Sequence, residues 1–225
     1  MIQETNAERG PKTSCRPRSE PAEFNIFEVM GAVRQELRHS DFLAFLLDPR
    51  ASHRLGDAFL KRLLNQALAA APELGGSVVE IDAADFADAE VRREWQRIDI
   101  LVHSADNRFV CVIENKIGGG EHSDQLRRYR DIVQRRFVNH RAVFIYLSPQ
   151  GDEPSDDAYA ALSYRGVADV MDALRRHNEK TLGSDLSLLM EHYTAMLRRH
   201  ILSGPLRPRE SALILHLERA NQMVV

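Results

Sequence analysis

Residues 98–116 of this 225-residue chain read IDILVHSADNRFVCVIENK, and this stretch decides the fold. Two apolar runs, 98–103 and 109–113, flank the polar segment 104–108. This pattern is typical of two antiparallel β-strands that are joined by a short turn. Three charged residues interrupt or follow the apolar runs. A charge in a buried strand is costly unless it is paired or binds a metal ion, so the hairpin carries charges that need an explanation.

Asp99, Glu114 and Lys116 are these three charges. Side chains alternate between the two faces of a strand, so Glu114 and Lys116 share one face. A four-residue turn over 104–107 would pair Asp99 with Val112 and bring Asp99 to the face of Glu114. An odd-numbered turn would place Asp99 on the opposite face, so the convergence of the two carboxylates depends on the strand register.

Two carboxylates on one face suit a hard divalent cation such as Mg²⁺, which commonly binds one or two carboxylates and keeps several waters. Asp99 and Glu114 are the candidate ligands, and the backbone carbonyl of Asn115 is the candidate third ligand. Such a cation lowers the pKa of a bound water and polarises a phosphoryl oxygen. Lys116 is placed to orient that water or to stabilise the developing negative charge. An ordinary ion pair at a strand end explains the same short spacing equally well.

Gln125 and Tyr129 form an i,i+4 pair on one face of the helix that we expect after this hairpin. The whole pattern resembles the PD-(D/E)XK nuclease superfamily, in which a D…E-x-K hairpin is followed by a helix that can carry Q-x-x-x-Y. Ile98 stands where the name motif has proline. The resemblance is to one bacterial family of these nucleases and covers about residues 24–150, through the segments 25–28, 36–40, 42–49, 55–60, 95–100 and 113–129.

The resemblance implies that Asp99 and Glu114 bind Mg²⁺ or Mn²⁺ and that Lys116 is the catalytic lysine. It gives Gln125 a supporting role from the helix, and it matches Glu36 to an acidic residue that the superfamily often supplies from its first helix. The implied activity is metal-dependent hydrolysis of phosphodiester bonds in nucleic acid, with DNA as the expected substrate.

The composition is that of a globular protein, with 44% hydrophobic residues and a net charge of −3. This net charge gives no global field toward nucleic acid, but a nuclease can present a locally basic surface. The expected helix after the hairpin carries several arginines, which either contact a DNA backbone or form an ordinary solvated face: Arg127, Arg128, Arg130, Arg135 and Arg136. Cys15 and Cys111 indicate neither a disulfide framework nor a zinc site.

Partners and location follow from the same features. We expect nucleic acid as the partner, no membrane contact and a cytoplasmic location, because no apolar run resembles a signal peptide or a membrane span. A homodimer is compatible with the sequence, which does not fix the oligomeric state. A non-catalytic nucleic-acid-binding module, or a regulatory protein-interaction module on the same fold, is the alternative function.

The pattern along the chain predicts an α/β fold with three layers, and the resemblance makes it a restriction-endonuclease-like core. N-terminal helices precede a mixed central sheet, and a helical C-terminal addition follows it. We expect a disordered polar tail at 1–22, a nuclease-like domain at 23–205 and a C-terminal helical extension at 206–225. The expected strands are 78–81, 90–96, 98–103, 109–116, 142–147 and 160–164. The expected helices after the first helical segment are 56–71, 123–137, 166–177 and 184–202, and Ser40 is expected to cap a helix of its own, with Glu36 on a preceding turn.

Overall fold

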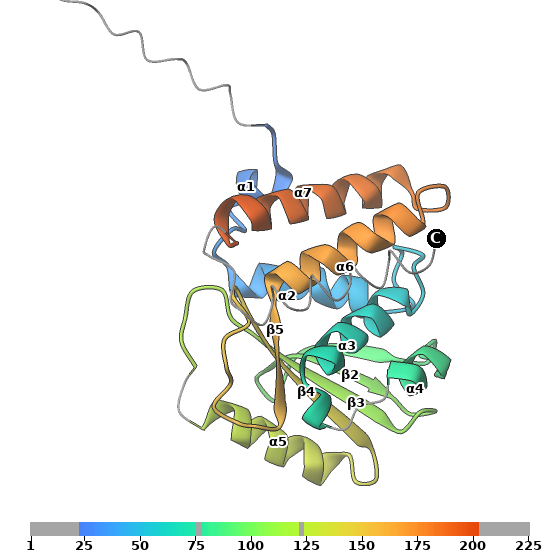
Figure 1. The fold of residues 1–225 in the computed structure, drawn as a ribbon, viewed down its shortest axis with the longest axis vertical. Helices are drawn as coiled ribbons and strands as arrows, with labels where there is room; N and C mark the ends of the chain where they lie inside the picture. The colour runs from blue at the N-terminus through green and yellow to red at the C-terminus, as the bar shows by residue number, and fades with distance from the viewer. Residues whose placement is uncertain (1–22, 75–77, 122–123, 203–225) are drawn as a thin grey trace, which may run out of the picture.

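A five-stranded mixed sheet forms the centre of the computed structural model, in which residues 23–74, 78–121 and 124–202 are described. The strands lie in the order β1-β2-β3-β4-β5 (Figure 1). The first three form an antiparallel meander, and β4 and β5 then run parallel to β3. Their bounds are β1 (Glu90–Trp95), β2 (Ile98–Ser104), β3 (Phe109–Asn115), β4 (Arg141–Ser148) and β5 (Tyr159–Ser163).

Helices cover both faces of this sheet. The described ones are α1 (Ile26–Val29), α2 (Glu36–Leu47), α3 (Ala58–Ala70), η1 (Pro72–Leu74), α4 (Val78–Ala83), α5 (Gln125–Arg136), α6 (Tyr164–His177) and α7 (Ser184–His200). Helix α5 packs on one face, α2 and α3 pack on the other, and α6 and α7 lie beyond them (Figure 1). The predicted α/β class with a mixed sheet and a helical C-terminal region is therefore confirmed.

Two apolar cores follow from the covering of both faces. The larger core lies between the sheet and α2, α3, α6 and α7, with Phe59 and Met171 fully buried. The smaller core lies under α5, where Leu126, Tyr129 and Val133 form a buried stripe at helical spacing. Strand β4 is buried along most of its length, as its continuous apolar run predicts for a strand that is covered on both sides.

The register between β2 and β3 differs by two residues from the predicted one. Ser104 pairs with Phe109, so the four-residue turn spans 105–108 instead of 104–107. The reason is a long-range contact, because the buried Ser104 hydroxyl donates a hydrogen bond of 2.6 Å to Asp88 and so keeps Ser104 in the strand.

This shift corrects the predicted partner of Asp99 but not its face. An even shift returns every side chain to the same side of the sheet. The ladder is paired up to Ile100 and Ile113, and its continuation places Asp99 opposite Glu114 instead of opposite Val112. The predicted convergence of the two carboxylates thus survives an incorrect register.

Two other local predictions are wrong. The weak strand at 78–81 is part of helix α4, in which Ile81 is the buried residue and packs into the larger core. Ser40 is an interior residue of α2 and caps no separate helix, because its hydroxyl is buried and accepts a hydrogen bond from Asn115. Glu36 is consequently the first residue of α2.

The other predicted strands, and the predicted helices from α3 onward, are present with ends within two residues of those expected. The predicted tail at 1–22 and the extension at 206–225 lie outside the described residues, so the domain boundaries stay predictions. Within the described ranges, no helix combines the length and the apolar character that crossing a membrane requires.

Candidate active site

The ends of β2 and β3 bring the two candidate carboxylates together. Asp99 is the second residue of β2, and its Oδ2 accepts a hydrogen bond of 2.8 Å from the backbone N–H of Asn115. Because Asn115 directly follows Glu114, this bond ties Asp99 to the end of β3 that carries the second carboxylate. The bond uses one Asp99 oxygen and is made by the backbone, so it does not depend on the type of side chain at position 115.

Glu114 is the centre of a buried polar cluster. Its side chain is 0% exposed. Its Oε1 forms an ion pair with Lys116 Nζ at 2.9 Å and accepts a hydrogen bond from Gln125 Nε2 at 2.7 Å. Gln125 also donates to the Tyr129 hydroxyl at 3.1 Å. The first residue of α5 therefore reaches the E-x-K motif, as the resemblance implies for this position, and Tyr129 supports it one turn later.

Two oxygens of this cluster have no hydrogen-bond partner among the described residues. They are Oε2 of Glu114 and Oε1 of Gln125, and both are buried. Buried polar atoms in folded proteins almost always have a partner, so an unpaired buried carboxylate oxygen indicates a ligand or a functional strain. The free side of Glu114 is consequently the place where a bound group would be stabilised.

Burial raises the pKa of Glu114 from 4.5 to about 7, and the negative charge of Asp99 adds to this effect. The hydrogen bond and charge of Lys116 act in the opposite direction, and the more distant charge of Glu36 raises the pKa further. Asp99 has this effect because two negative charges in one site repel each other, which disfavours the ionised form of Glu114.

The pKa values of Asp99 and Lys116 are also raised in the fold. Burial raises the pKa of Asp99, although the hydrogen bond from Asn115 and the charge of Lys116 oppose it. For Lys116, burial acts to lower the pKa, but the hydrogen bond and charge of Glu114, with the charges of Glu36 and Asp99, outweigh it and raise the pKa. Lys116 is therefore a protonated amine at neutral pH.

Glu36 joins the cluster from the first turn of α2. Its Oε1 accepts hydrogen bonds from the backbone N–H of Ile117 at 2.9 Å and of Gly118 at 3.4 Å. These bonds hold the chain that leaves β3 immediately after Lys116. Glu36 thus contacts the backbone beside the lysine and contributes negative charge, whereas its direct partners are backbone amides.

Asn115 anchors the motif on the opposite face of the sheet. Its side-chain Nδ2 donates to Ser40 Oγ at 2.8 Å and to the carbonyl of Glu36 at 3.2 Å, while its Oδ1 accepts from the Tyr164 hydroxyl at 2.6 Å. All three contacts are made to helices, α2 and α6. Because side chains alternate along β3, this anchor fixes Glu114 and Lys116 on the other face.

Sequence reasoning missed several residues that support the site. Arg93 on β1 donates to the backbone carbonyl of Asp99, to that of Leu37 at 3.2 Å and to Asp41 at 3.2 Å, and so ties β2 to α2. Tyr164 bonds to Asn115 from a distant part of the chain. No local motif marks either residue, since both act through contacts that only the folded chain creates.

The donor set fits a hard divalent cation with few protein ligands. Within the described part of the chain, no group of three or more His, Cys, Asp or Glu side chains is placed to hold a metal ion. Mg²⁺ is often bound by one or two carboxylates with waters, so Asp99 and Glu114 suffice, and the Asn115 carbonyl is the candidate third ligand. A cation beside Glu114 would meet its unpaired oxygen and offset the burial and the repulsion by Asp99 that raise its pKa.

An α/β fold with two carboxylates and a lysine at the ends of neighbouring strands defines a class of nuclease-like proteins, and comparison with known families agrees. The family model described as the PD-(D/E)XK nuclease superfamily matches residues 24–195, which is more than half of the chain and reaches into α7. Comparison with curated proteins and with solved structures gives no match. This chain belongs to the PD-(D/E)XK nuclease superfamily, whose members generally use divalent metals such as Mg²⁺.

Proposed function

We propose that this chain is a metal-dependent nuclease that hydrolyses phosphodiester bonds, with DNA as its substrate and Mg²⁺ or Mn²⁺ as its cofactor. The observation that carries the proposal is the state of Glu114: a fully buried carboxylate with a raised pKa and one unpaired oxygen, beside Asp99 and Lys116. Such a combination of burial and charge is typical of functional sites and is costly in a merely structural position.

Asp99 and Glu114 are the proposed metal ligands, with the Asn115 carbonyl. When bound, the cation would polarise a phosphoryl oxygen and lower the pKa of a bound water. Gln125 occupies the other oxygen of Glu114 and so fixes the carboxylate with Oε2 available.

Lys116 has the role of a charged donor in this proposal. Its raised pKa keeps it protonated, so it does not accept a proton from the attacking water near neutral pH. Its ammonium group would orient an attacking water and stabilise the negative charge that develops on the phosphoryl group. Glu36 is an auxiliary residue that positions the backbone after Lys116 through Ile117 and Gly118.

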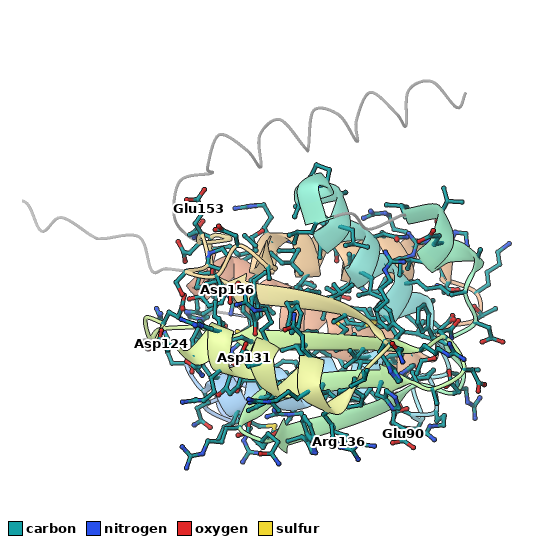
Figure 2. All side chains as sticks on the ribbon, turned by 90° about the horizontal axis from the view of Figure 1, so that it is seen from below. Glu90, Asp124, Asp131, Arg136, Glu153 and Asp156 are labelled. Atoms are coloured by element: carbon teal, nitrogen blue, oxygen red, sulfur yellow. The ribbon has the colours of Figure 1, made fainter. Side chains whose placement is uncertain are left out.

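Helix α5 supports the assignment of nucleic acid as the substrate. Four of its arginines are exposed: Arg127, Arg128, Arg135 and Arg136. Figure 2 shows Arg136 toward the opposite end of this helix from Asp124, so the arginines extend along it. Neutralising phosphates with such side chains releases counterions and gives affinity without sequence preference.

We also expect a cytoplasmic location. A homodimer is a further prediction, which a mass measurement in solution would test.

The test uses the purified full chain with single-stranded DNA, double-stranded DNA and RNA of matched sequence, in Mg²⁺, Mn²⁺ or EDTA. Asp99→Asn keeps an acceptor for the Asn115 N–H but removes the negative charge of the carboxylate. Lys116→Gln removes the positive charge of the lysine. We expect each to lower cleavage at least about a hundredfold. Asp106→Asn and Lys180→Gln are matched exposed controls, and they are expected to cleave like the wild type.

Equal cleavage by Asp99→Asn, Lys116→Gln and their controls would refute this site. Metal-independent binding of DNA, with no cleavage of any of the three substrates, would favour the non-catalytic module instead. Cleavage of RNA in preference to DNA would keep the site and correct the substrate.

A further inference from the structure

All five tyrosines of the chain lie in the described residues, and one of them differs from the rest. Four hydroxyls are hydrogen-bonded inside the protein: Tyr129 to Gln125 at 3.1 Å, Tyr159 to the Leu126 carbonyl at 3.1 Å, Tyr164 to Asn115 at 2.6 Å and Tyr193 to His39 at 2.8 Å. Within residues 23–74, 78–121 and 124–202, the hydroxyl of Tyr146 has no such partner.

Tyr146 stands directly beside the candidate active site. It is the register partner of Glu114 in the parallel β3–β4 ladder, so the two side chains leave the sheet on the same face. Its ring packs in the smaller core under α5, and only 5% of the residue is exposed. The hydroxyl is not among the fully buried polar atoms that lack a partner, so it is the part of the side chain that reaches solvent.

The charges around Tyr146 show what its hydroxyl faces. Burial raises the pKa of Tyr146, and the carboxylates of Glu121, Asp152 and Glu114 raise it further, whereas Lys116 acts to lower it. The hydroxyl therefore lies within the field of the E-x-K pair and of two acidic residues on neighbouring loops. The hydroxyl is a hydrogen-bond donor at neutral pH, as any tyrosine hydroxyl is.

Packing alone does not account for a tyrosine at this position. Phe144 lies two residues earlier on the same face of β4 and fills the same core with an unsubstituted ring. A phenylalanine would serve equally at 146 if only apolar contact were needed. The hydroxyl reaches solvent beside Glu114 and makes no hydrogen bond to the described residues, so it is available to a ligand bound there.

The loop between β4 and β5 limits what this ligand can be. It is fixed beside the site, because the Ser155 N–H donates to Glu121 at 3.0 Å and Arg130 pairs with Asp156 at 2.5 Å. Figure 2 shows Asp156 and Glu153 of this loop on the same side of the molecule as Asp124, at the start of α5. Arg130 offsets the charge of Asp156, but Glu121 and Asp152 place negative charge near Tyr146 and so disfavour a further phosphate there. At the Asp99–Glu114 site, a bound cation would offset the charge of a scissile phosphate.

We infer that Tyr146 is a further catalytic residue, whose hydroxyl donates a hydrogen bond to an oxygen of the scissile nucleotide, on its phosphodiester or its adjoining sugar. The inference rests on the proposed nuclease function and adds a substrate contact to it. The contact requires no movement of the sheet, because Tyr146 and Glu114 are fixed neighbours on adjacent strands.

Tyr146→Phe is the test, with Tyr159→Phe as the matched control. Both tyrosines belong to the smaller core, but the Tyr159 hydroxyl is already bonded to the Leu126 carbonyl. We expect Tyr146→Phe to lower kcat/KM about tenfold on the DNA that the wild type cleaves, since the lost bond is to a charged or strongly polar oxygen. Its Mn²⁺ affinity and Tm stay at wild-type values. Tyr159→Phe is expected to lower the Tm and to keep kcat/KM.

The outcomes separate this inference from the proposed function. An active wild type with an equally active Tyr146→Phe variant overturns the inference alone. A loss of Tm or Mn²⁺ affinity in Tyr146→Phe that accounts for its lower activity also overturns it, because the hydroxyl would then be structural. A wild type that cleaves no nucleic acid with Mg²⁺ or Mn²⁺ overturns the proposed function and this contact together.

Discussion

Replacing Glu114 by glutamine isolates the cost of its buried charge. The amide oxygen can still accept hydrogen bonds from Lys116 and Gln125, so the change removes the charge with little change of shape. A pKa raised from 4.5 to about 7 corresponds to a free-energy difference of about 3 kcal/mol between the two protonation states. Ionised Glu114 therefore destabilises the metal-free fold by about that amount.

The sign of the pH dependence follows from proton binding. The folded protein holds the Glu114 proton more tightly than the unfolded chain, because the pKa of Glu114 is raised in the fold. The free energy of unfolding of the wild type thus falls as pH rises from about 4.5 to about 7, and the loss is complete above that range. Asp99, whose pKa is also raised, acts in the same direction from a lower starting pH.

Urea unfolding at pH 4.5, 6 and 8 without metal measures this effect. We expect the stability of Glu114→Gln, relative to wild type, to increase by about 3 kcal/mol between pH 4.5 and pH 8. Any cost of the new amide group is independent of pH and cancels in this difference. Glu179→Gln is the exposed control and is expected to show no such trend. A flat difference for Glu114→Gln would refute the account of a strained carboxylate. Saturating Mn²⁺ at pH 8 is expected to stabilise the wild type, by about 3 kcal/mol at a hundred times Kd, and not the variant.

Three further predictions concern the same cluster and the core behind it. Lys116→Met removes the charge that lowers the pKa of Glu114, so calorimetric Mn²⁺ binding should begin at a higher pH than in wild type; an unchanged onset would contradict this. Tyr164→Phe leaves the buried Asn115 oxygen without its donor and should lower the free energy of unfolding by about 1–3 kcal/mol in urea. Leu64→Ala opens a cavity in the larger core and should cost about 2–5 kcal/mol by the same assay, and a smaller loss would mean that α3 collapses onto the space.

Local pattern was sufficient to predict the central sheet. The apolar runs of the hairpin and of β4 have the length and composition of buried strands, and the polar turn between β2 and β3 separates them clearly. The register was missed because it depends on Ser104 bonding to Asp88, a residue of a distant loop. Helix α4 (Val78–Ala83) was predicted as a strand at 78–81 because a short apolar run with one buried side chain, Ile81, gives no clear period.

The residues of the candidate site likewise include some that the sequence identifies and some that it does not. Asp99, Glu114 and Lys116 could be selected from the sequence because a charge in an apolar strand is conspicuous wherever the strand lies. Arg93 and Tyr146 could not, since an arginine on an edge strand and a tyrosine in a buried one are ordinary residues until their neighbours are known. The sequence thus identifies the charged side chains that carry the chemistry, but it does not reveal the contacts that orient them.

The alternation of β3 explains how the fold tolerates so costly a cluster. Glu114 and Lys116 lie on the face toward α5, where ionised Glu114 is destabilising in the absence of a cation. Asn115, between them, points to the other face and satisfies its whole side chain with Ser40, the Glu36 carbonyl and Tyr164. Those partners belong to helices of the larger core, which supplies most of the buried apolar surface. Strand β3 is thus held in place through Asn115 on the face opposite Glu114, so repulsion between the carboxylates cannot relax by moving β3. In the proposed function, a cation held between them would offset this repulsion, which would favour its binding by only two charged ligands.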